Sequence, residues 1–557
     1  MALRFPRTLV MLAVFVASMN AAAAAEPPGD ACSRPPMGAV IAGPPELRSS
    51  HGALVVDLSL RNFTDVYGAK TYCYVDQNGQ QAPTLRVRPG DELVVHLKNR
   101  LEGEPGAMPM HVHGASPQAC GTAPMNALTT NLHFHGMGLP PTCHQDETLR
   151  TAVNPSDPAF EYRLKIPLDA PPGLYWYHPH PHGYTEQQVL GGASGALIVE
   201  GIEKDSPVVS GLPERVMVLR DQKIPGMTEN DEDSGPGKDI SLNFVPVMYP
   251  LYRPAELPVR PGEREFWRVL NASADTYFVI QLRFGSTIQE IGDPQALELI
   301  GVDGVPTRPA ASATEILLAP GARAEFVVTT PAEGTFAQLV TLKYDTGPDG
   351  AASPYRVIAN VRSRADAPAA PSAMPPGAGA TKNAATAVLK PVQSRKLYFS
   401  EDRADLKDPR QRAKYFITVE GQTPRVFDMN FTKPDVTAVQ GTLEDWTIEN
   451  RTKEAHAFHI HQIHFQVIER DGKPVDDGTW RDTIDLPFWD GNSVSYPSVK
   501  LRMDFRSPET VGTFVFHCHI LEHEDGGMMG SIQVLPHARN QKGNGRFAGG
   551  AAGAVVK

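Results

Sequence analysis

Two short motifs recur three times, in the same order, along the 557-residue chain. In the first, a glycine precedes an asparagine by nine positions: Gly90 and Asn99, Gly262 and Asn271, Gly441 and Asn450. The second is a glycine followed by a β-prone stretch, with copies that begin at Gly173, Gly334 and Gly512. A glycine turn before such a stretch is typical of a strand that enters a sandwich. The glycines at 90, 262 and 441 are 172 and 179 residues apart, which predicts three tandem β-domains.

The repeats also set the expected domain boundaries. We expect an all-β fold in which residues 45–203, 204–363 and 393–537 each form a Greek-key β-sandwich domain. Residues 364–392 are rich in alanine, proline and glycine, which predicts a flexible linker before the third domain. The glycine- and alanine-rich residues 538–557 are expected to form a disordered tail.

The N-terminus predicts export. Arg4 and Arg7 precede an apolar run that is too short to span a bilayer, and a run of alanines follows it. We expect residues 1–25 to be a signal peptide and the mature, monomeric protein to be periplasmic or secreted. The net charge of −11, with no basic block, argues against nucleic acid as a partner, and no later segment predicts a membrane span.

The five cysteines allow two disulfides and one free thiol. If Cys518 binds a metal, four cysteines remain, and they can pair in three ways. Proximity in sequence favours the pairs Cys32–Cys73 and Cys120–Cys143. Free thiols at some of these four positions are an equally open alternative.

Histidines are the most informative residues for function. The chain has 18 of them, and six His-x-His pairs occur. Residues i and i+2 of a strand project from the same face, so their two imidazoles can converge on one metal or on two adjacent metals. No histidine lies between His182 and His456, so the middle domain carries none. We interpret the middle domain as a metal-free spacer that sets the geometry of the outer two.

One tripeptide, His517-Cys518-His519, predicts two different metal sites on a single strand. Its two histidines would face one way and Cys518 the other. Cys518, with His456, His523 and a weak axial Met528, forms the ligand set of a blue copper site. Structural zinc is the alternative, but methionine is a rare ligand for zinc.

Four motifs together carry a resemblance to a known family. They are His133-Phe-His135-Gly136, His178-Pro-His180, His456-x-x-His459-x-His461, and the segment from His517 to Met528. With them the chain resembles the three-domain multicopper oxidases, a laccase-like group of bacterial type, over about residues 45 to 537. The resemblance implies that the three sandwiches are cupredoxin-like and that the protein holds four copper ions.

The resemblance also implies which residues bind each ion. The expected ligand sets are, for one type 1 copper, His456, Cys518, His523 and axial Met528; for one type 2 copper, His133 and His459; and for two type 3 coppers, His135, His178 and His519, and His180, His461 and His517. An electron would enter near His456 or His523 and pass from Cys518 through the backbone to His517 and His519.

The implied reaction is oxidation of a reductant, one electron at a time, coupled to four-electron reduction of O2 to water. A phenol or aromatic amine is the favoured reductant. Oxidation of a cuprous or other metal ion for copper tolerance is one alternative. A copper storage or carrier protein, which would bind the metal without consuming O2, is an alternative from another class.

A second early pair competes with His133 and His135. His111 and His113 also precede a glycine, but the family spacing to the next motif favours His133 and His135. His111 and His113 then fall in an insertion over about residues 101–128, with several methionines. The insertion is either an extra copper site or an ordinary surface loop.

Oxygen reduction consumes protons, so acidic residues are expected near the cluster. Asp146 and Glu524 match family positions and are the candidate catalytic proton relays, beside Cys518 as the electron-transfer residue. Asp482 and Asp485 are weaker candidates for accepting a proton from a phenol.

Overall fold

The computed structural model describes residues 32–64, 68–104, 120, 125–223, 238–285, 292–370, 390–403, 413–476 and 478–537. The expected signal peptide, most of the linker, the C-terminal tail, and His111 with His113 lie outside these ranges, so their structure stays a prediction. Within the described residues almost every regular element is a strand, and the strands form six sheets. The predicted all-β fold is confirmed. No helix among these residues has both the length and the apolar character needed to cross a membrane.

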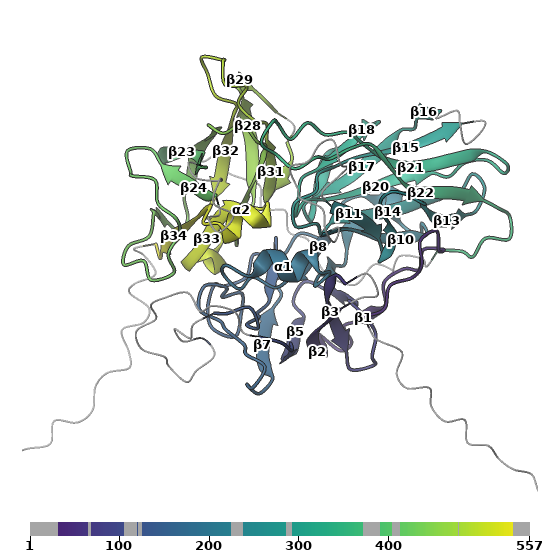
Figure 1. The fold of residues 1–557 in the computed structure, drawn as a ribbon, viewed down its shortest axis with the longest axis horizontal. Helices are drawn as coiled ribbons and strands as arrows, with labels where there is room; N and C mark the ends of the chain where they lie inside the picture. Colours follow the sequence, from purple (N-terminus) through teal and green to yellow (C-terminus); the bar gives the residue numbers. More distant parts are fainter. Residues whose placement is uncertain are drawn as a thin grey trace, which may run out of the picture.

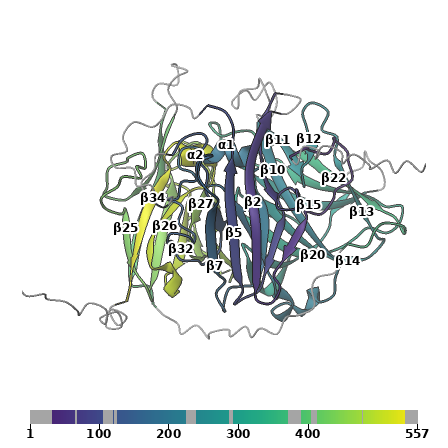
Figure 2. The same ribbon diagram turned by 90° about the horizontal axis from the view of Figure 1, so that it is seen from below.

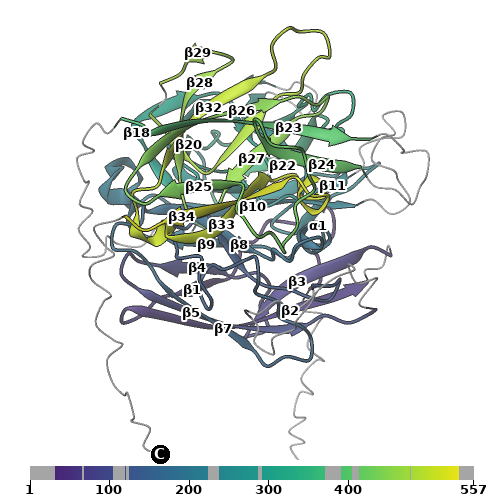
Figure 3. The same cartoon turned by 90° about the vertical axis from the view of Figure 1, so that its left-hand side faces the viewer.

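The first sandwich is built from two sheets around one core (Figures 1 and 3). Its first sheet has the order β3-β2-β5-β7, with β2 at Ala53–Thr64, β3 at Lys70–Asp76, β5 at Glu92–Arg100 and β7 at Phe160–Lys165. Its second sheet has the order β1-β4-β9-β8-β6, with β1 at Glu46–Arg48, β4 at Thr84–Val87, β6 at His133–His135, β8 at Gly173–His178 and β9 at Gly195–Val199. The helix α1, Thr185–Leu190, connects β8 to β9, and the 3-10 turns η1, Ile202–Lys204, and η2, Pro207–Val209, follow.

The second sandwich also has two sheets. One has the order β12-β11-β10-β14-β20-β17-β18, with β10 at Glu214–Lys223, β11 at Lys238–Leu242, β12 at Val245–Val247, β14 at Arg264–Asn271, β17 at Leu297–Val302, β18 at Val305–Ala313 and β20 at Arg323–Thr329. The other has the order β13-β22-β21-β15-β16, and β19 pairs with β15; the bounds are β13 at Ala255–Val259, β15 at Phe278–Gly285, β16 at Asp293–Pro294, β19 at Ile316–Leu318, β21 at Phe336–Leu342 and β22 at Arg356–Ser363.

The third sandwich follows the same plan. One sheet has the order β24-β23-β26-β32-β28-β29, and β30 pairs with β28; the bounds are β23 at Gln393–Asp402, β24 at Lys414–Val419, β26 at Leu443–Asn450, β28 at Phe465–Arg470, β29 at Lys473–Pro474, β30 at Trp480–Arg481 and β32 at Ser498–Asp504. The other has the order β25-β34-β33-β27-β31, with β25 at Val436–Val439, β27 at His456–Ile460, β31 at Thr483–Leu486, β33 at Gly512–Cys518 and β34 at Met529–Leu535. The turn η3, Pro508–Thr510, precedes β33, and the short helix α2, Leu521–Asp525, follows it.

The sequence repeat has a structural cause in all three sandwiches. The repeated glycines Gly90, Gly262 and Gly441 have positive φ angles of 89°, 65° and 92°, which favour glycine over residues with a side chain. Each turn leads into a central strand that ends at the repeated asparagine, or one residue after it in β5, and pairs in parallel with an earlier strand: β5 with β2, β14 with β10, and β26 with β23. Figure 2 shows β2 beside β5 and β10 near β14.

The repeated asparagines fix the loops that follow these strands. Asn99, Asn271 and Asn450 are all fully buried. In each, the side-chain amide donates to at least two backbone carbonyl groups later in the chain, and the side-chain oxygen accepts from the backbone amide two residues later. A buried amide with all these bonds made is stable, whereas an unpaired one costs free energy. These hydrogen bonds therefore hold the loop after the central strand in the same way in each sandwich.

Both disulfides favoured by the sequence are present. Cys32 pairs with Cys73, and Cys120 pairs with Cys143. Cys518 is free and buried, as its expected role requires.

The two α-helices join the first sandwich to the third near the centre of the molecule (Figure 1). Asp525, at the end of α2, accepts hydrogen bonds from the backbone amides of Thr185 and Glu186 at the start of α1, at 3.1 and 2.9 Å. These amides have no partner within their own helix, so a carboxylate from another domain caps them.

We expect Asp525→Ala to lower the free energy of unfolding by about 1 to 2 kcal/mol, because both amides lose the carboxylate that caps them. Denaturant unfolding of the full chain measures the effect. Asp525→Asn retains one acceptor oxygen and is expected to lose less. An unchanged midpoint for Asp525→Ala would show that this cap contributes nothing to the docking of the two sandwiches.

Candidate metal centre

Eight histidines from the first and third sandwiches meet at the interface between them. In the first sandwich, His133 on β6 lies opposite His178 on β8; in the third, His459 on β27 lies opposite His517 on β33. The cluster is completed by His135, His180, His461 and His519, and none of the eight is more than 3% exposed. The rings of His133 and His461, from different sandwiches, stack with their centroids 3.8 Å apart. The predicted convergence of the four His-x-His pairs is what the structure shows.

Hydrogen bonds on the outer side of the cluster fix the tautomer of several rings. The Nδ1 atoms of His178, His459 and His517 donate to the backbone carbonyl groups of Pro179, Asp482 and Cys518, at 2.9, 2.9 and 3.0 Å. His133 Nδ1 donates to the Asp146 carboxylate at 3.0 Å. A ring that donates from Nδ1 presents the lone pair of Nε2 on its other side. His135 is reversed, because its Nε2 lies 3.1 Å from Asp482 Oδ1 and leaves Nδ1 for the cluster.

Most of the inward nitrogens have no protein hydrogen-bond partner. Buried atoms without a hydrogen bond include Nε2 of His133, His178 and His459, Nδ1 of His135, and both ring nitrogens of His519. His517 Nε2 lies 3.4 Å from His180 Nε2 and 3.2 Å from His461 Nε2. Buried nitrogens without a hydrogen bond cost folding free energy. A cation shared by the Nε2 atoms of His180, His461 and His517 would explain why these three atoms converge.

Burial also favours the neutral form of several of these rings. It lowers the pKa of His133, His178 and His461 well below the usual value, and neighbouring histidines lower it further. A neutral imidazole is the form that binds a metal. The potential ligand atoms of His180, His461 and His517 lie within 4.8 Å of one another, as do those of His133, His459 and His461, and those of His133, His135 and His178.

A second site lies on the other face of the same strand, within the third sandwich. Cys518 Sγ is 3.5 Å from His456 Nδ1 and 3.6 Å from His523 Nδ1, and the two nitrogens are 3.1 Å apart. Met528 is fully buried next to this set, and its backbone carbonyl accepts from Cys518 N at 3.1 Å. The predicted alternation along His517-Cys518-His519 is therefore present: one thiol faces one site, and its two neighbours face the other.

Besides Asp482, two further carboxylates contact the histidine cluster, and they are the two acids that the sequence predicted as proton relays. Glu524 is fully buried, with Oε2 3.1 Å from His517 Nδ1 and Oε1 3.6 Å from His180 Nε2. Burial opposes its ionisation, but the two histidines outweigh burial and lower its pKa. Asp146 lies beside His133, and burial raises its pKa well above the usual value. Two acids whose pKa values are driven apart can serve as donor and acceptor of protons.

Other residues around the sites were not found from the sequence. Gln462 donates to Asp146 Oδ2 at 2.7 Å, and Glu454 Oε1 lies 3.4 Å from His523 Nε2. The one feature of the sequence that could have identified Gln462 is its position directly after the predicted ligand His461. Glu454 is two residues before His456.

The suggested role of Asp482 and Asp485 in accepting a phenol proton was wrong for Asp482. Asp482 is fully buried behind His135 and His459 and is paired with Arg323, so no substrate reaches it. Asp485 forms an ion pair with Arg470 at 3.1 Å.

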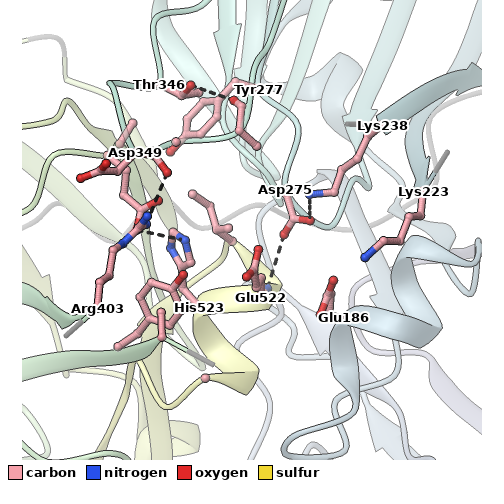
Figure 4. A pocket seen from close by; sticks show the side chains of 18 residues that line it. Glu186, Lys223, Lys238, Asp275, Tyr277, Thr346, Asp349, Arg403, Glu522 and His523 are labelled. Carbon is pink, nitrogen blue, oxygen red and sulfur yellow. Dashed lines mark hydrogen bonds and ion pairs between the residues drawn. The ribbon is translucent and has the colours of Figure 1, made fainter. Parts of the chain in front are cut away.

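A cavity of about 330 Å³ opens beside His523, where all three sandwiches meet (Figure 4). Its acidic lining residues are Glu186, Asp275, Asp349, Glu454 and Glu522, and its basic ones are Lys223, Lys238 and Arg403. Tyr277 and Tyr415 supply aromatic surface, and the Tyr415 ring stacks on His523 with centroids 4.3 Å apart. The cavity therefore reaches a ligand of the Cys518 site and not the buried histidine cluster.

Comparison with known proteins agrees with this geometry. Three sequence profiles described as multicopper oxidase match residues 124–204, 176–355 and 399–538. The multicopper oxidase mco of Staphylococcus haemolyticus is 26% identical over 473 residues, which is 81% of each chain. Among solved structures, the 2F4 variant of the multicopper oxidase McoA from Aquifex aeolicus is similar with a TM-score of 0.65 and 20% identity, over 89% of this chain and 99% of that chain. The multicopper oxidase from Campylobacter jejuni, described as a metallo-oxidase, has a TM-score of 0.63 and 23% identity, over 90% and 96%.

Proposed function

Because the chain belongs to the multicopper oxidase family, we propose that it oxidises a small reductant beside His523 and delivers the electrons to the histidine cluster, where O2 is reduced to water. One observation carries the proposal. A complete thiolate site and a complete eight-histidine cluster are both buried and are joined by the single tripeptide His517-Cys518-His519.

The residues present fit copper. Thiolate, thioether and imidazole are soft or borderline ligands that suit copper and disfavour magnesium or calcium. His456, Cys518, His523 and Met528 would hold the type 1 ion. The eight cluster histidines would hold the type 2 ion and the type 3 pair, in the sets that the family resemblance implies. When bound, copper supplies one-electron redox chemistry at the first site and O2 binding and reduction at the second.

The protein itself provides the electron path between the two sites and the acids that carry protons to the cluster. Cys518 is one peptide unit from His517 on one side and from His519 on the other, so the backbone is the shortest covalent path between the sites. Asp146 and Glu524 reach His133 and His517 directly, which places an acid on either side of the cluster. Burial excludes bulk water from both, so protons reach the cluster through these groups.

For the reductant, we propose a phenol or an aromatic amine. The cavity at His523 has the size of a small organic ligand and carries two tyrosines. Oxidation of a phenol releases a proton, and Glu454, beside both His523 and Arg403, lies where a carboxylate could take part in its removal. A metal ion is the second candidate, because acidic side chains outnumber basic ones around the cavity.

Steady-state rates separate these reductants. Wild-type protein loaded with copper is given a methoxyphenol, Fe(II) or Cu(I), and O2 uptake is recorded. We expect kcat/KM for the phenol to exceed that for either ion. We also expect Glu522→Gln to change the phenol value by less than about 3-fold, because loss of one charge at a mixed-charge surface is a small effect.

The opposite pattern would support the second candidate. If Glu522→Gln lowered kcat/KM for a metal ion about tenfold and left the phenol unchanged, the carboxylates would be binding the substrate cation. Glu509→Gln, at a half-buried acid in η3 that does not line the cavity, is the matched control. Copper that binds without any O2 uptake would favour a storage or carrier protein instead.

We also propose that the protein is exported, as the N-terminal residues 1–25 predict. Fractionation of cells that make the full chain, followed by N-terminal sequencing, tests this. A mature protein that retains residues 1–25 in the cytoplasm would contradict it.

A further inference from the structure

The middle sandwich reaches the histidine cluster with its own residues. The loop before β20 passes Gly321, whose φ is +87°, directly against the cluster. A Cβ on Gly321 would lie 3.0 Å from His519 Nε2 and 3.1 Å from His135 Cε1. Glycine is therefore required both by the backbone conformation and by the close approach. The middle domain, interpreted from the sequence as a metal-free spacer that sets the geometry of the outer two, therefore also contacts the cluster directly.

Two residues after Gly321, Arg323 links all three sandwiches. It is fully buried, and its Nε donates to the Leu174 carbonyl of the first sandwich at 3.1 Å. Nη1 and Nη2 donate to Oδ1 and Oδ2 of Asp482, in the third sandwich, each at 2.7 Å. This is a two-pronged guanidinium–carboxylate pair, the geometry that gives strong and directional ion pairs.

The carboxylate of this pair faces two cluster histidines. Asp482 Oδ1 accepts from His135 Nε2 at 3.1 Å, and the Asp482 backbone carbonyl accepts from His459 Nδ1 at 2.9 Å. One residue thus sets the ring orientation and tautomer of a histidine from the first sandwich and of another from the third. Burial opposes ionisation of Asp482, but the charge of Arg323 outweighs it and holds the pKa well below the usual range.

A second carboxylate from the middle sandwich supports the same arrangement. Asp303 Oδ1 accepts from the backbone amide of Arg323 at 2.8 Å. Its Oδ2 accepts from the backbone amides of Asp482 and Thr483, both at 3.2 Å. The middle sandwich therefore holds Asp482 by its side chain and by its backbone.

The first motif ends in glycine, Gly136, because a residue with a side chain does not fit at this position. Its φ is +83°, and a Cβ there would overlap Arg323 Nη2 and Asp482 Oδ2. The glycine leaves room for the ion pair beside the ligand.

We propose that Arg323 and Asp482 are positioning residues for the copper cluster, through which the histidine-free middle sandwich aligns His135 with His459. The inference rests on the proposed function, because it assigns the two histidines to copper. Loss of either partner leaves a buried charge unpaired and frees two ligand rings. Outer groups of this kind typically contribute 10- to 100-fold to metal affinity.

The test compares copper retention in wild type and in Arg323→Met. Each full-length protein is loaded with copper and dialysed against increasing concentrations of a chelator. Copper content, the blue absorbance and the type 2 EPR signal are then measured. For Arg323→Met we expect cluster copper to be released at about 10- to 100-fold lower chelator concentration, with the type 2 signal altered and the blue absorbance retained.

The matched control is Arg86→Met. Arg86 is 3% exposed and pairs with the buried Glu214, so it also joins the first two sandwiches, but no hydrogen bond or ion pair of its side chain involves a cluster histidine. We expect this variant to lose thermal stability and to retain cluster copper like wild type. Equal copper retention by Arg323→Met and Arg86→Met would overturn the positioning role.

If Arg323→Met does not fold, Arg323→Lys replaces it in the test. It keeps the buried charge but cannot form both prongs, so it is expected to fold and to show the same shift in retention and in the EPR signal. Wild-type retention in this variant would also overturn the inference. A wild-type protein that binds no copper would instead refute the proposed function, so the two failures are distinguishable.

Discussion

Replacing Cys518 by serine is expected to abolish the blue absorbance and all measurable O2 uptake. Cys518 provides the one thiol sulfur among the ligand atoms of the described residues, and it lies 3.5 and 3.6 Å from the ring nitrogens of His456 and His523. A hydroxyl at this buried position is a poor ligand for copper. Without the Cys518 sulfur, electrons from a reductant in the cavity cannot enter the path to His517 and His519. Absorbance, copper content and O2 uptake of the purified variant measure the effect, and we expect about one copper fewer per chain.

Met528→Leu is the control for this variant. It changes the same buried site but leaves the thiolate and both histidines in place, so the colour should persist with a changed reduction potential. A serine variant that kept its colour and its O2 uptake would sink the assignment of Cys518. An uncoloured variant that still consumed O2 would show that electrons reach the cluster by another path.

Glu524→Gln is expected to slow O2 reduction by about 100-fold, the usual contribution of a positioned proton donor or acceptor. Glutamine has the same shape but cannot exchange a proton. Its amide would still lie beside His517 and His180, so the cluster geometry should be preserved. The measurement is single-turnover reoxidation of the fully reduced protein by O2, which separates this step from substrate oxidation.

The neighbouring Asp525→Asn provides a matched control. Asp525 is half-buried, accepts from the backbone amides of Thr185 and Glu186, and contacts no cluster histidine by a hydrogen bond or ion pair. Its substitution should therefore leave the reoxidation rate near the wild-type value. If Glu524→Gln also lost its blue absorbance, Glu524 would be holding the structure together rather than moving protons.

Residues with local signals could be predicted from the sequence. His-x-His pairs on strands predicted the cluster, since strand geometry fixes which side chains share a face. Gly90 and its two equivalents predicted three sandwiches, because the glycine turn and the buried asparagine depend on nearby backbone. Cys32–Cys73 and Cys120–Cys143 were favoured by proximity and were confirmed.

Residues that act through distant contacts could not be predicted. Arg323 and Asp482 are 159 positions apart, and neither lies in a motif that reports the other. The absence of histidine from the middle sandwich predicted a metal-free spacer that sets the geometry of the outer two, but it did not identify the residues that do so. That reading missed Gly321 and Asp303, whose contributions are a backbone approach and a carboxylate. Only the docking of three domains brings such groups together.

The placement of the two sites gives metal loading an order. His456, Cys518 and His523 all belong to the third sandwich, so this site can form as soon as that domain has folded. The cluster needs histidines from the first and third sandwiches at once, so it can form only after they dock. An assembly intermediate should therefore be blue but unable to reduce O2. The appearance of colour and the onset of oxidase activity are thus two separate events in the maturation of this protein.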